Sequence, residues 1–163
     1  MSYNIYKISL RNQFHFLWQA LLLMLFTFSF TLFLSDSLTV IIGTTAFIFL
    51  LDTLPTLIVH VQYLANNWHA TLTIDRNQNK ISYSTKEFEK QYSFESIEKI
   101  TRLSCYNQSA PSHSFGDYFY YKIFLKDENP LIITCLLADD LEIYQSIIFP
   151  TFEKKKKIIP LIN

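Results

Sequence analysis

Glycine and charged residues are scarce in this chain of 163 residues. Gly43 and Gly116 are the only glycines, which excludes the glycine-rich loops that hold nucleotide phosphates. The sequence also lacks Gly-x-Ser-x-Gly, His-Glu-x-x-His and any paired carboxylates in a recognisable catalytic pattern. Charged residues make up 17% of the chain, below the roughly 25% usual in soluble domains. We therefore expect a protein without enzymatic activity, part of which is unusually apolar.

Cysteine is equally scarce, because Cys105 and Cys135 are the only two. They lack Cys-x-x-Cys spacing and have no set of histidines nearby, so the pattern does not indicate a metal site. Each falls in a predicted strand, and both are most simply interpreted as reduced core residues. We expect neither a metal nor a cofactor.

Two long apolar runs, in contrast, occupy residues 14–34 and 38–51. The first has 21 residues, enough for about 30 Å of helix and one bilayer crossing. The second continues through Asp52 and stays mostly apolar to Leu64. Because only residues 35–37 separate the runs, the two helices must be antiparallel and in contact. The sequence therefore predicts a transmembrane helical hairpin over residues 14–64, with its turn at 35–37.

The charges that flank the hairpin predict its orientation. Lys7 and Arg11 precede the first run, the turn contributes only Asp36, and a run of lysines follows the domain near the C-terminus. By the positive-inside rule, the N-terminus (residues 1–13) and the rest of the chain share the cytoplasmic side. We expect a multi-pass protein of the cell inner (cytoplasmic) membrane with both termini in the cytoplasm.

Polar residues form a stripe on each predicted helix. His15 and Gln19 are four residues apart, as are Asp52 and Thr56, and Thr56 and His60. An isolated carboxylate in hydrocarbon costs several kcal/mol, so Asp52 needs a partner, for which Gln19, Thr56 and His60 are the candidates. Two interpretations stay open: polar contacts that join the helices, or a site that handles protons or ions. Under the first, Asp52→Leu should be tolerated.

Pro55 should kink the second helix just after Asp52, because proline has no backbone N–H to donate. The helix should then continue along the membrane interface to about Leu64. Tyr63 and Trp68 would be aromatic anchors at headgroup level.

Residues 65–150 show the alternation of a β domain. Six short strands are predicted, joined by turns with no helix between them, so the sheet should be antiparallel; they cover residues 69–75, 80–85, 88–94, 97–105, 118–126 and 130–136. Helical spacing then begins at Asp139 or Asp140 and ends at Pro150. Such strands must curl into a small barrel or sandwich, closed by the C-terminal helix. The predicted fold class is an α+β membrane protein.

Several segments resemble small bacterial membrane proteins that carry a pleckstrin-homology-like (PH-like) domain behind two transmembrane helices. The segments are Leu72-Thr73-Ile74-Asp75 with Lys80-Ile81, then residues 92–97, 120–127 and 132–137. The resemblance implies a curled antiparallel sheet with a capping helix, and it carries no catalytic signature. The chain departs from the eukaryotic pattern in having six predicted strands rather than seven. The loop at 75–79 lacks a Lys/Arg cluster, so phosphoinositide binding is not implied.

The last predicted segment, residues 151–163, is a lysine-rich tail that contains Lys154, Lys155, Lys156 and Lys157. Each lysine near an anionic membrane contributes about 1 kcal/mol, so the tail is a candidate membrane contact. The alternative is a solvated end outside the core. In either case, replacing the four lysines should leave the stability of the domain nearly unchanged.

These observations predict a membrane-anchored PH-like interaction or scaffold module that binds a protein or peptide partner at a sheet edge or at the loop around His113. Other expected partners are anionic lipid and a second copy of the chain. Residues 65–150 contain eight Lys and Arg against eleven Asp and Glu, which argues against a nucleic-acid polymer. Two alternatives stay open. One is a sensor of a small molecule, such as a cyclic oligonucleotide, whose β-barrel drives hairpin oligomerisation and membrane disruption. The other is a channel or transporter subunit that uses Asp52 and His60.

Overall fold

The computed structural model describes residues 3–106, 113–126, 128–138 and 152–162. Helices and strands follow one another in this order: β1 (Tyr3–Lys7), α1 (Leu10–Leu34), α2 (Leu38–Ile48), the π-helical turn η1 (Phe49–Thr53), α3 (Leu54–Asn67), β2 (Thr71–Asp75), β3 (Lys80–Ser84), β4 (Glu89–Ser93), the 3-10 turn η2 (Phe94–Ser96), β5 (Ile97–Cys105), β6 (Phe119–Leu125), β7 (Glu128–Thr134) and β8 (Phe152–Lys157).

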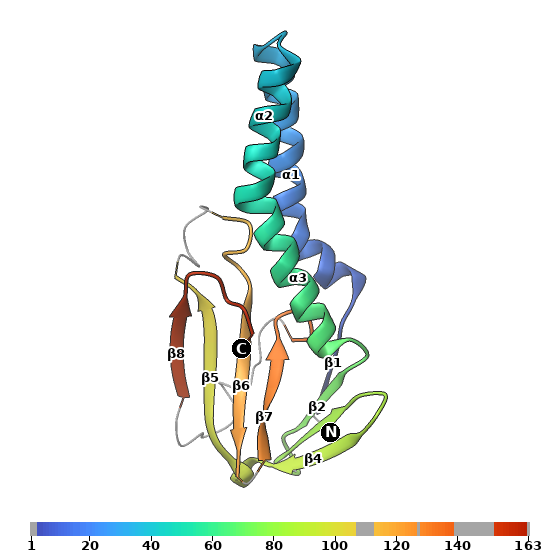
Figure 1. The fold of residues 1–163 in the computed structure, drawn as a ribbon. Coiled ribbons are helices and arrows are strands. Elements are labelled where there is room, and N and C mark those ends of the chain that lie inside the picture. The colour runs from blue at the N-terminus through green and yellow to red at the C-terminus, as the bar shows by residue number, and fades with distance from the viewer. Residues whose placement is uncertain (1–2, 107–112, 127, 139–151, 163) are drawn as a thin grey trace.

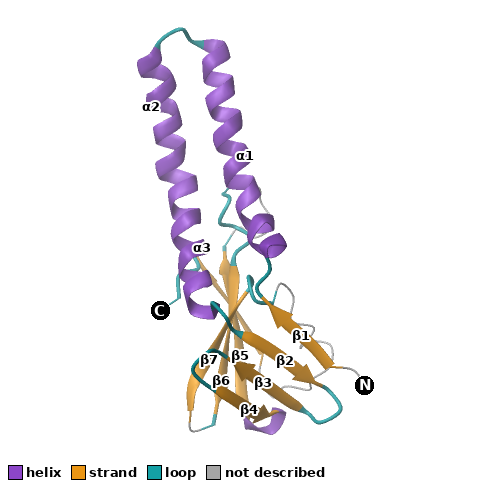
Figure 2. Cartoon of the chain, turned by 90° about the vertical axis from the view of Figure 1, so that its right-hand side faces the viewer, coloured by secondary structure: helices purple, strands orange, loops and turns teal. Residues whose placement is uncertain are grey.

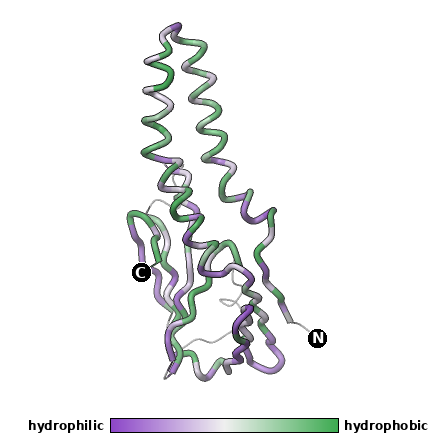
Figure 3. Tube along the Cα trace, turned by 45° about the vertical axis from the view of Figure 1, so that its right-hand side comes forward, coloured by the Kyte–Doolittle hydropathy of each residue, from purple (hydrophilic) through white to green (hydrophobic). Residues whose placement is uncertain are grey.

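The two predicted apolar helices are present, and they project together from one end of the β domain (Figure 1). Ser9 begins α1 as an N-cap, since its side chain accepts a hydrogen bond from the Asn12 N–H. The segments Leu10–Leu34 and Leu38–Asn67 are long and apolar enough to cross a membrane, by length and composition. Their surface is predominantly hydrophobic in the outer part of the hairpin (Figure 3).

The irregularity predicted near Pro55 takes the form of a π-helical turn. Proline cannot donate the backbone hydrogen bond that a regular α-helix requires. The turn η1 directly precedes α3, and the Leu54 N–H donates to the Phe49 carbonyl five residues earlier. The helix thereby absorbs one extra residue, which turns the face that carries Asp52.

The first sheet has the strand order β1-β2-β3-β4, and its neighbours are antiparallel. Strand β1 lies before the hairpin in sequence and β2 after it, yet they pair directly, from Tyr3 with Asp75 to Lys7 with Thr71. The helical hairpin is therefore inserted between two adjacent strands, as the 90° turned view shows (Figure 2). The prediction that residues 1–13 are only a cytoplasmic N-terminal segment missed this strand.

The second sheet has the order β7-β6-β5-β8 and differs from the prediction in two respects. Strand β8 contains the four lysines that were expected in a tail, and it runs parallel to β5, so the sheets are not all antiparallel. The described strands number eight rather than six, and they form two sheets without a closed barrel.

One hydrophobic core joins the sheets and the lower part of α3. It includes Leu72 and Ile81 from the first sheet, Ile123 and Ile133 from the second, and Val59 from α3. Cys105 and Cys135 are both buried and neither forms a disulfide, as expected for reduced core residues. The C-terminal helix predicted from residue 139 to 150 lies outside the described residues.

Candidate functional site at the base of the hairpin

The carboxylate of Asp52 is buried and bonded to the β domain rather than to α1. Asp52 is 5% exposed. The Ser114 N–H donates to Oδ1 at 2.8 Å, and the Ser114 hydroxyl lies 2.5 Å from Oδ2. His113 Nδ1 is 3.8 Å from Oδ1. The Asp52 carboxylate therefore does not bond Gln19, Thr56 or His60, the partners that the sequence suggested. The π-helical turn directs it instead toward Ser114, which lies 62 residues away in sequence.

The other polar residues of the two helices also have separate partners. The Thr56 hydroxyl donates to the Asp52 carbonyl within its own helix at 2.7 Å. His60 Nδ1 lies 2.9 Å from the Tyr118 hydroxyl, and Gln19 donates to Asp117 at 3.4 Å. His15 is exposed and packs edge-on against a neighbouring ring. The structure therefore does not bring the five residues together as one cluster.

The contacts of Asp52, His60 and Gln19 all reach one segment, residues 113–118, which we call the 113–118 loop. Ser114, Phe115 and Tyr118 are buried at its centre. The Tyr118 ring packs against Phe16 of α1 at 5.1 Å and Tyr63 of α3 at 5.6 Å between ring centroids. Burial raises the pKa of Tyr118 well above the ordinary tyrosine value. This loop therefore fills the space at the base of the hairpin and contacts both helices.

Sequence analysis missed this role of the loop. The polar residues around His113 favoured a peripheral loop available to a partner, whereas Phe115 and Tyr118 carry the buried surface. The one sequence feature that could have predicted burial of the loop is the pair Phe115 and Tyr118 on either side of Gly116 and Asp117. Large aromatic side chains are seldom left in solvent.

Tyr63 and Trp68 have different environments. Tyr63 is fully buried, and its hydroxyl donates to the Pro160 carbonyl at 2.7 Å, so it lies in the core and not at a membrane surface. Trp68 ends α3 and is 52% exposed, in keeping with an interfacial position. His69 follows with a φ of 64°, and this left-handed residue turns the chain from α3 into β2.

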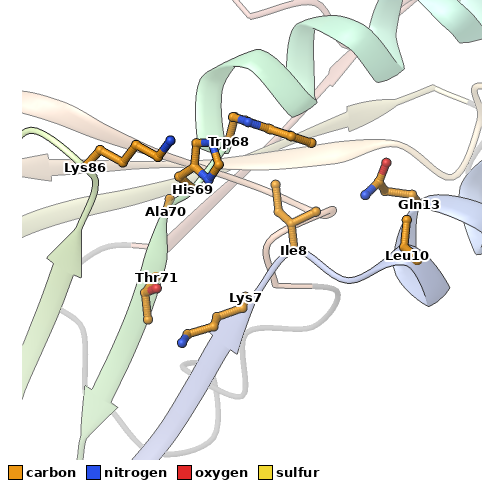
Figure 4. Close-up of a pocket in the computed structure, with 9 residues that line it drawn as sticks. All are labelled: Lys7, Ile8, Leu10, Gln13, Trp68, His69, Ala70, Thr71 and Lys86. Atoms are coloured by element: carbon orange, nitrogen blue, oxygen red, sulfur yellow. The ribbon is translucent and has the colours of Figure 1, made fainter.

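A surface pocket of about 470 Å³ opens beside Trp68. Figure 4 shows Lys7 from the end of β1, Lys86 from the turn between β3 and β4, and Trp68 and His69 from the end of α3. A second pocket of about 560 Å³ lies along the first turns of α1 and is lined by Arg11, Asn12, Phe14, His15 and Trp18. Basic and aromatic side chains thus line both pockets at the base of the hairpin.

The lysine run in β8 is partly engaged within the protein. Lys157 is half-buried and donates to the Leu161 carbonyl at 2.8 Å and the Tyr120 hydroxyl at 3.2 Å. Lys156 donates to the Tyr106 carbonyl at 3.3 Å. Glu153 pairs with Lys99 at 2.6 Å, and this hydrogen bond lowers the pKa of the Glu153 carboxyl. The four lysines therefore do not form one set of unengaged side chains that could contact a membrane together.

The described residues contain no group of three or more His, Cys, Asp or Glu side chains arranged to hold a metal ion. The side chains at the hairpin base offer charge, hydrogen bonding and aromatic contact.

Comparison with known proteins identifies the family. The family model described as PH domain matches residues 5–146. The chain therefore belongs to the PH-domain family, whose members are generally non-catalytic interaction modules. The match extends from β1 across the hairpin, in agreement with the pairing of β1 and β2 in one sheet. No curated protein and no solved structure matches the chain.

Proposed function

We propose that this protein is a membrane-anchored PH-domain interaction module without enzymatic activity. The hairpin anchors it in the inner membrane, and the β domain and both termini lie on the cytoplasmic side. The observation that carries the proposal is the hairpin itself: in the most apolar part of α1, only 6% of residues are buried by the protein. An apolar surface of that length needs a lipid or protein cover.

The two pockets at the hairpin base support contact with anionic lipid. Lys7, Arg11 and Lys86 provide positive charge, and Trp18 and Trp68 provide aromatic rings suited to the headgroup layer. We assign the lipid contact to these residues rather than to the four lysines of β8 acting as one unit.

Strand β8 is the outermost described strand of the second sheet, and its outer edge supports a site for a protein partner. Edge strands carry unpaired backbone groups that can bind an extended segment, and charged side chains decide which segments are accepted. Lys154, Lys155 and Lys156 are exposed along this edge, so an acidic segment is the partner of matching charge. That segment can belong to another protein or to a second copy of the chain.

Neither of the two alternatives has comparable support. A small-molecule sensor needs an internal cavity, and the two pockets described above are open at the surface beside the hairpin base. Asp52 and His60 are each bonded to the 113–118 loop, and a proton or ion path would need them to face a shared aqueous route.

Cysteine labelling in intact cells tests the proposal. A cysteine at Asp36 should react with a membrane-impermeant maleimide from outside, and one at the exposed position Lys154 should react only after the membrane is opened. The chain should remain in the membrane fraction after a high-salt wash. Labelling of position 154 from outside would overturn the orientation, and recovery in the soluble fraction would overturn the anchor.

The lipid contact is tested by native mass spectrometry of the detergent-extracted protein with added phosphatidylglycerol. Changing Lys7 and Lys86 together to Gln should lower the amount of bound lipid. Lys80→Gln, an exposed lysine at the other end of the first sheet, is the matched control and should bind as the native protein does. Equal binding of phosphatidylglycerol by the native protein, the double variant and the Lys80→Gln control would contradict the assignment of the lipid contact to the pockets.

A further inference from the structure

The 113–118 loop reaches a level well inside the apolar hairpin. Ser114 bonds Asp52 on one helix, and Asp117 accepts a hydrogen bond from Gln19 on the other. Between this level and the turn lie residues 20–34 of α1 and 38–51 of the second helix, which are 15 and 14 residues. They span about 21 to 22 Å at 1.5 Å per residue. This length is shorter than a hydrocarbon core of about 30 Å.

A bilayer crossing requires about 20 residues of each helix. The missing length can come only from the residues below the level of Asp52, which are residues 14–19 of α1 and residues 52–57. These are the segments against which the loop packs. If these segments enter the membrane, the loop must enter with them.

We propose that the 113–118 loop lies within the cytoplasmic boundary of the bilayer, and that the adjoining ends of β5 and β8 contact the headgroup layer. The proposal rests on the membrane anchor proposed above and adds that the β domain itself is partly immersed. The partner of this surface is the lipid bilayer.

The buried residues of the loop meet the physical conditions for such a position, whereas His113 and Asp117 are exposed and must face the headgroup layer rather than hydrocarbon. Non-helical backbone is tolerated at membrane depth only where protein covers it. Ser114 and Phe115 are 6% and 5% exposed, and Tyr118 is fully buried. The Asp52 carboxylate accepts hydrogen bonds from the Ser114 N–H and hydroxyl, and the Tyr118 hydroxyl is bonded to His60. These buried polar groups therefore already have hydrogen-bond partners within the protein, so placing them in the bilayer leaves none of them unsatisfied.

The strand ends beside the loop are followed by exposed apolar side chains. Strands β5 and β8 both end toward the hairpin (Figure 1). The residues that directly follow them, Tyr106 and Ile158, are 60% and 80% exposed. The Lys156 ammonium donates to the Tyr106 carbonyl, which keeps a positive charge at this end. An aromatic ring, an aliphatic side chain and a lysine together suit the headgroup layer.

Spin labels on the full-length protein test the proposal in vesicles of phosphatidylethanolamine and phosphatidylglycerol. Single cysteines are introduced at Ile158, at Phe26 in the hairpin, at Asp36 in its turn, and at Gln78 in the turn between β2 and β3. The unsubstituted protein gives the labelling background, because Cys105 and Cys135 are buried. Collision rates with oxygen and with a water-soluble nickel chelate report the depth of each label. A cysteine at Tyr106 serves if the Ile158 variant fails to fold.

The proposal expects a spin label at position 158 to be severalfold less accessible to the nickel chelate than a label at position 78. The label at position 26 should lie in hydrocarbon, and the label at position 36 should lie in water. A label at 158 as accessible as one at 78, with 26 in hydrocarbon, overturns the immersion of the domain and leaves the anchor standing. If 158 is in water and 36 is in hydrocarbon, the hairpin stops inside the bilayer, and the proposal fails. If 26 is in water, the membrane anchor fails, and this inference fails with it.

Discussion

At the scale of single residues, the partner of Asp52 determines how the protein should respond to substitution there. The Ser114 N–H and hydroxyl both bond the carboxylate in a buried environment. From the sequence, Asp52→Leu was expected to be tolerated because it removes a buried charge. The structure reverses that expectation, because leucine would leave two buried donors of Ser114 without an acceptor.

We expect Asp52→Leu to lower the free energy of unfolding by about 1–3 kcal/mol, since an unsatisfied buried polar group costs that much. Asp52→Asn keeps one acceptor oxygen and should cost less. Ser114→Ala removes the hydroxyl and keeps the N–H, so it serves as the intermediate control. Urea unfolding of the detergent-solubilised protein measures all three. An Asp52→Leu protein as stable as the native one would contradict the structural role of this contact.

At the scale of elements, β8 and the segment that follows it hold the C-terminus against α3. Gln62 exchanges two hydrogen bonds with Ile162, at 2.9 and 3.0 Å, and the Tyr63 hydroxyl donates to the Pro160 carbonyl. Lys157 donates to the Leu161 carbonyl from the end of β8. The C-terminal segment therefore links the second sheet to the lower part of the hairpin.

Lys157→Met and Lys154→Met form a matched pair that tests this link. Lys157→Met loses two hydrogen bonds, to Leu161 and Tyr120, and should cost about 1 kcal/mol of stability. Lys154 is exposed, and its replacement should change stability by less than about 0.5 kcal/mol. Hydrogen exchange should quicken at the Ile162 amide in the first variant only. Equal effects of the two variants would show that the lysine run behaves as the tail first predicted.

At the scale of the whole molecule, the inserted hairpin makes anchor and domain one folded unit. The lower part of α3 contributes Val59 and Tyr63 to the core, and Asn67 bonds both sheets, through the Tyr83 hydroxyl and the backbone of Ile132 and Thr134. A force on the hairpin is therefore transmitted to both sheets. The domain cannot be separated from the hairpin by cutting a simple linker.

Buried tyrosines predict how the whole protein responds to alkaline pH. Burial raises the pKa of Tyr118, Tyr83 and Tyr120 in the folded state above the ordinary value of 10.0. Their contribution to stability is complete below about pH 10 and is lost as the pH rises above it, because the unfolded chain releases these protons first. Thermal unfolding should show a constant midpoint from pH 8 to 9 and a falling one from about pH 10 upward.

Tyr118→Phe provides the control for this pH dependence. The variant should be less stable at pH 8, since His60 loses its partner, but its stability should fall less steeply above about pH 10. Identical slopes in the variant and the native protein would assign the alkaline effect to other groups.

Local patterns in the sequence were enough to predict the two apolar helices and most strands, while the PH-like character of the chain came from its resemblance to a known family. The length of an apolar run and the alternation of side chains depend only on neighbouring residues. The helices α1 and α2–α3 and the strands β2 to β7 followed from such patterns. The PH-like family was predicted from the resemblance of several segments, and the family match confirms it.

Only the tertiary structure decided the pairing of β1 with β2, the place of β8 and the partner of Asp52. Strand β1 has the sequence Tyr-Asn-Ile-Tyr-Lys, and β8 contains four consecutive lysines, so neither shows the clear apolar alternation of a strand. Asp52 and Ser114 are 62 residues apart. Contacts across such distances depend on how complete elements pack and on one extra residue in a π-helical turn, and no local pattern of residues encodes that geometry.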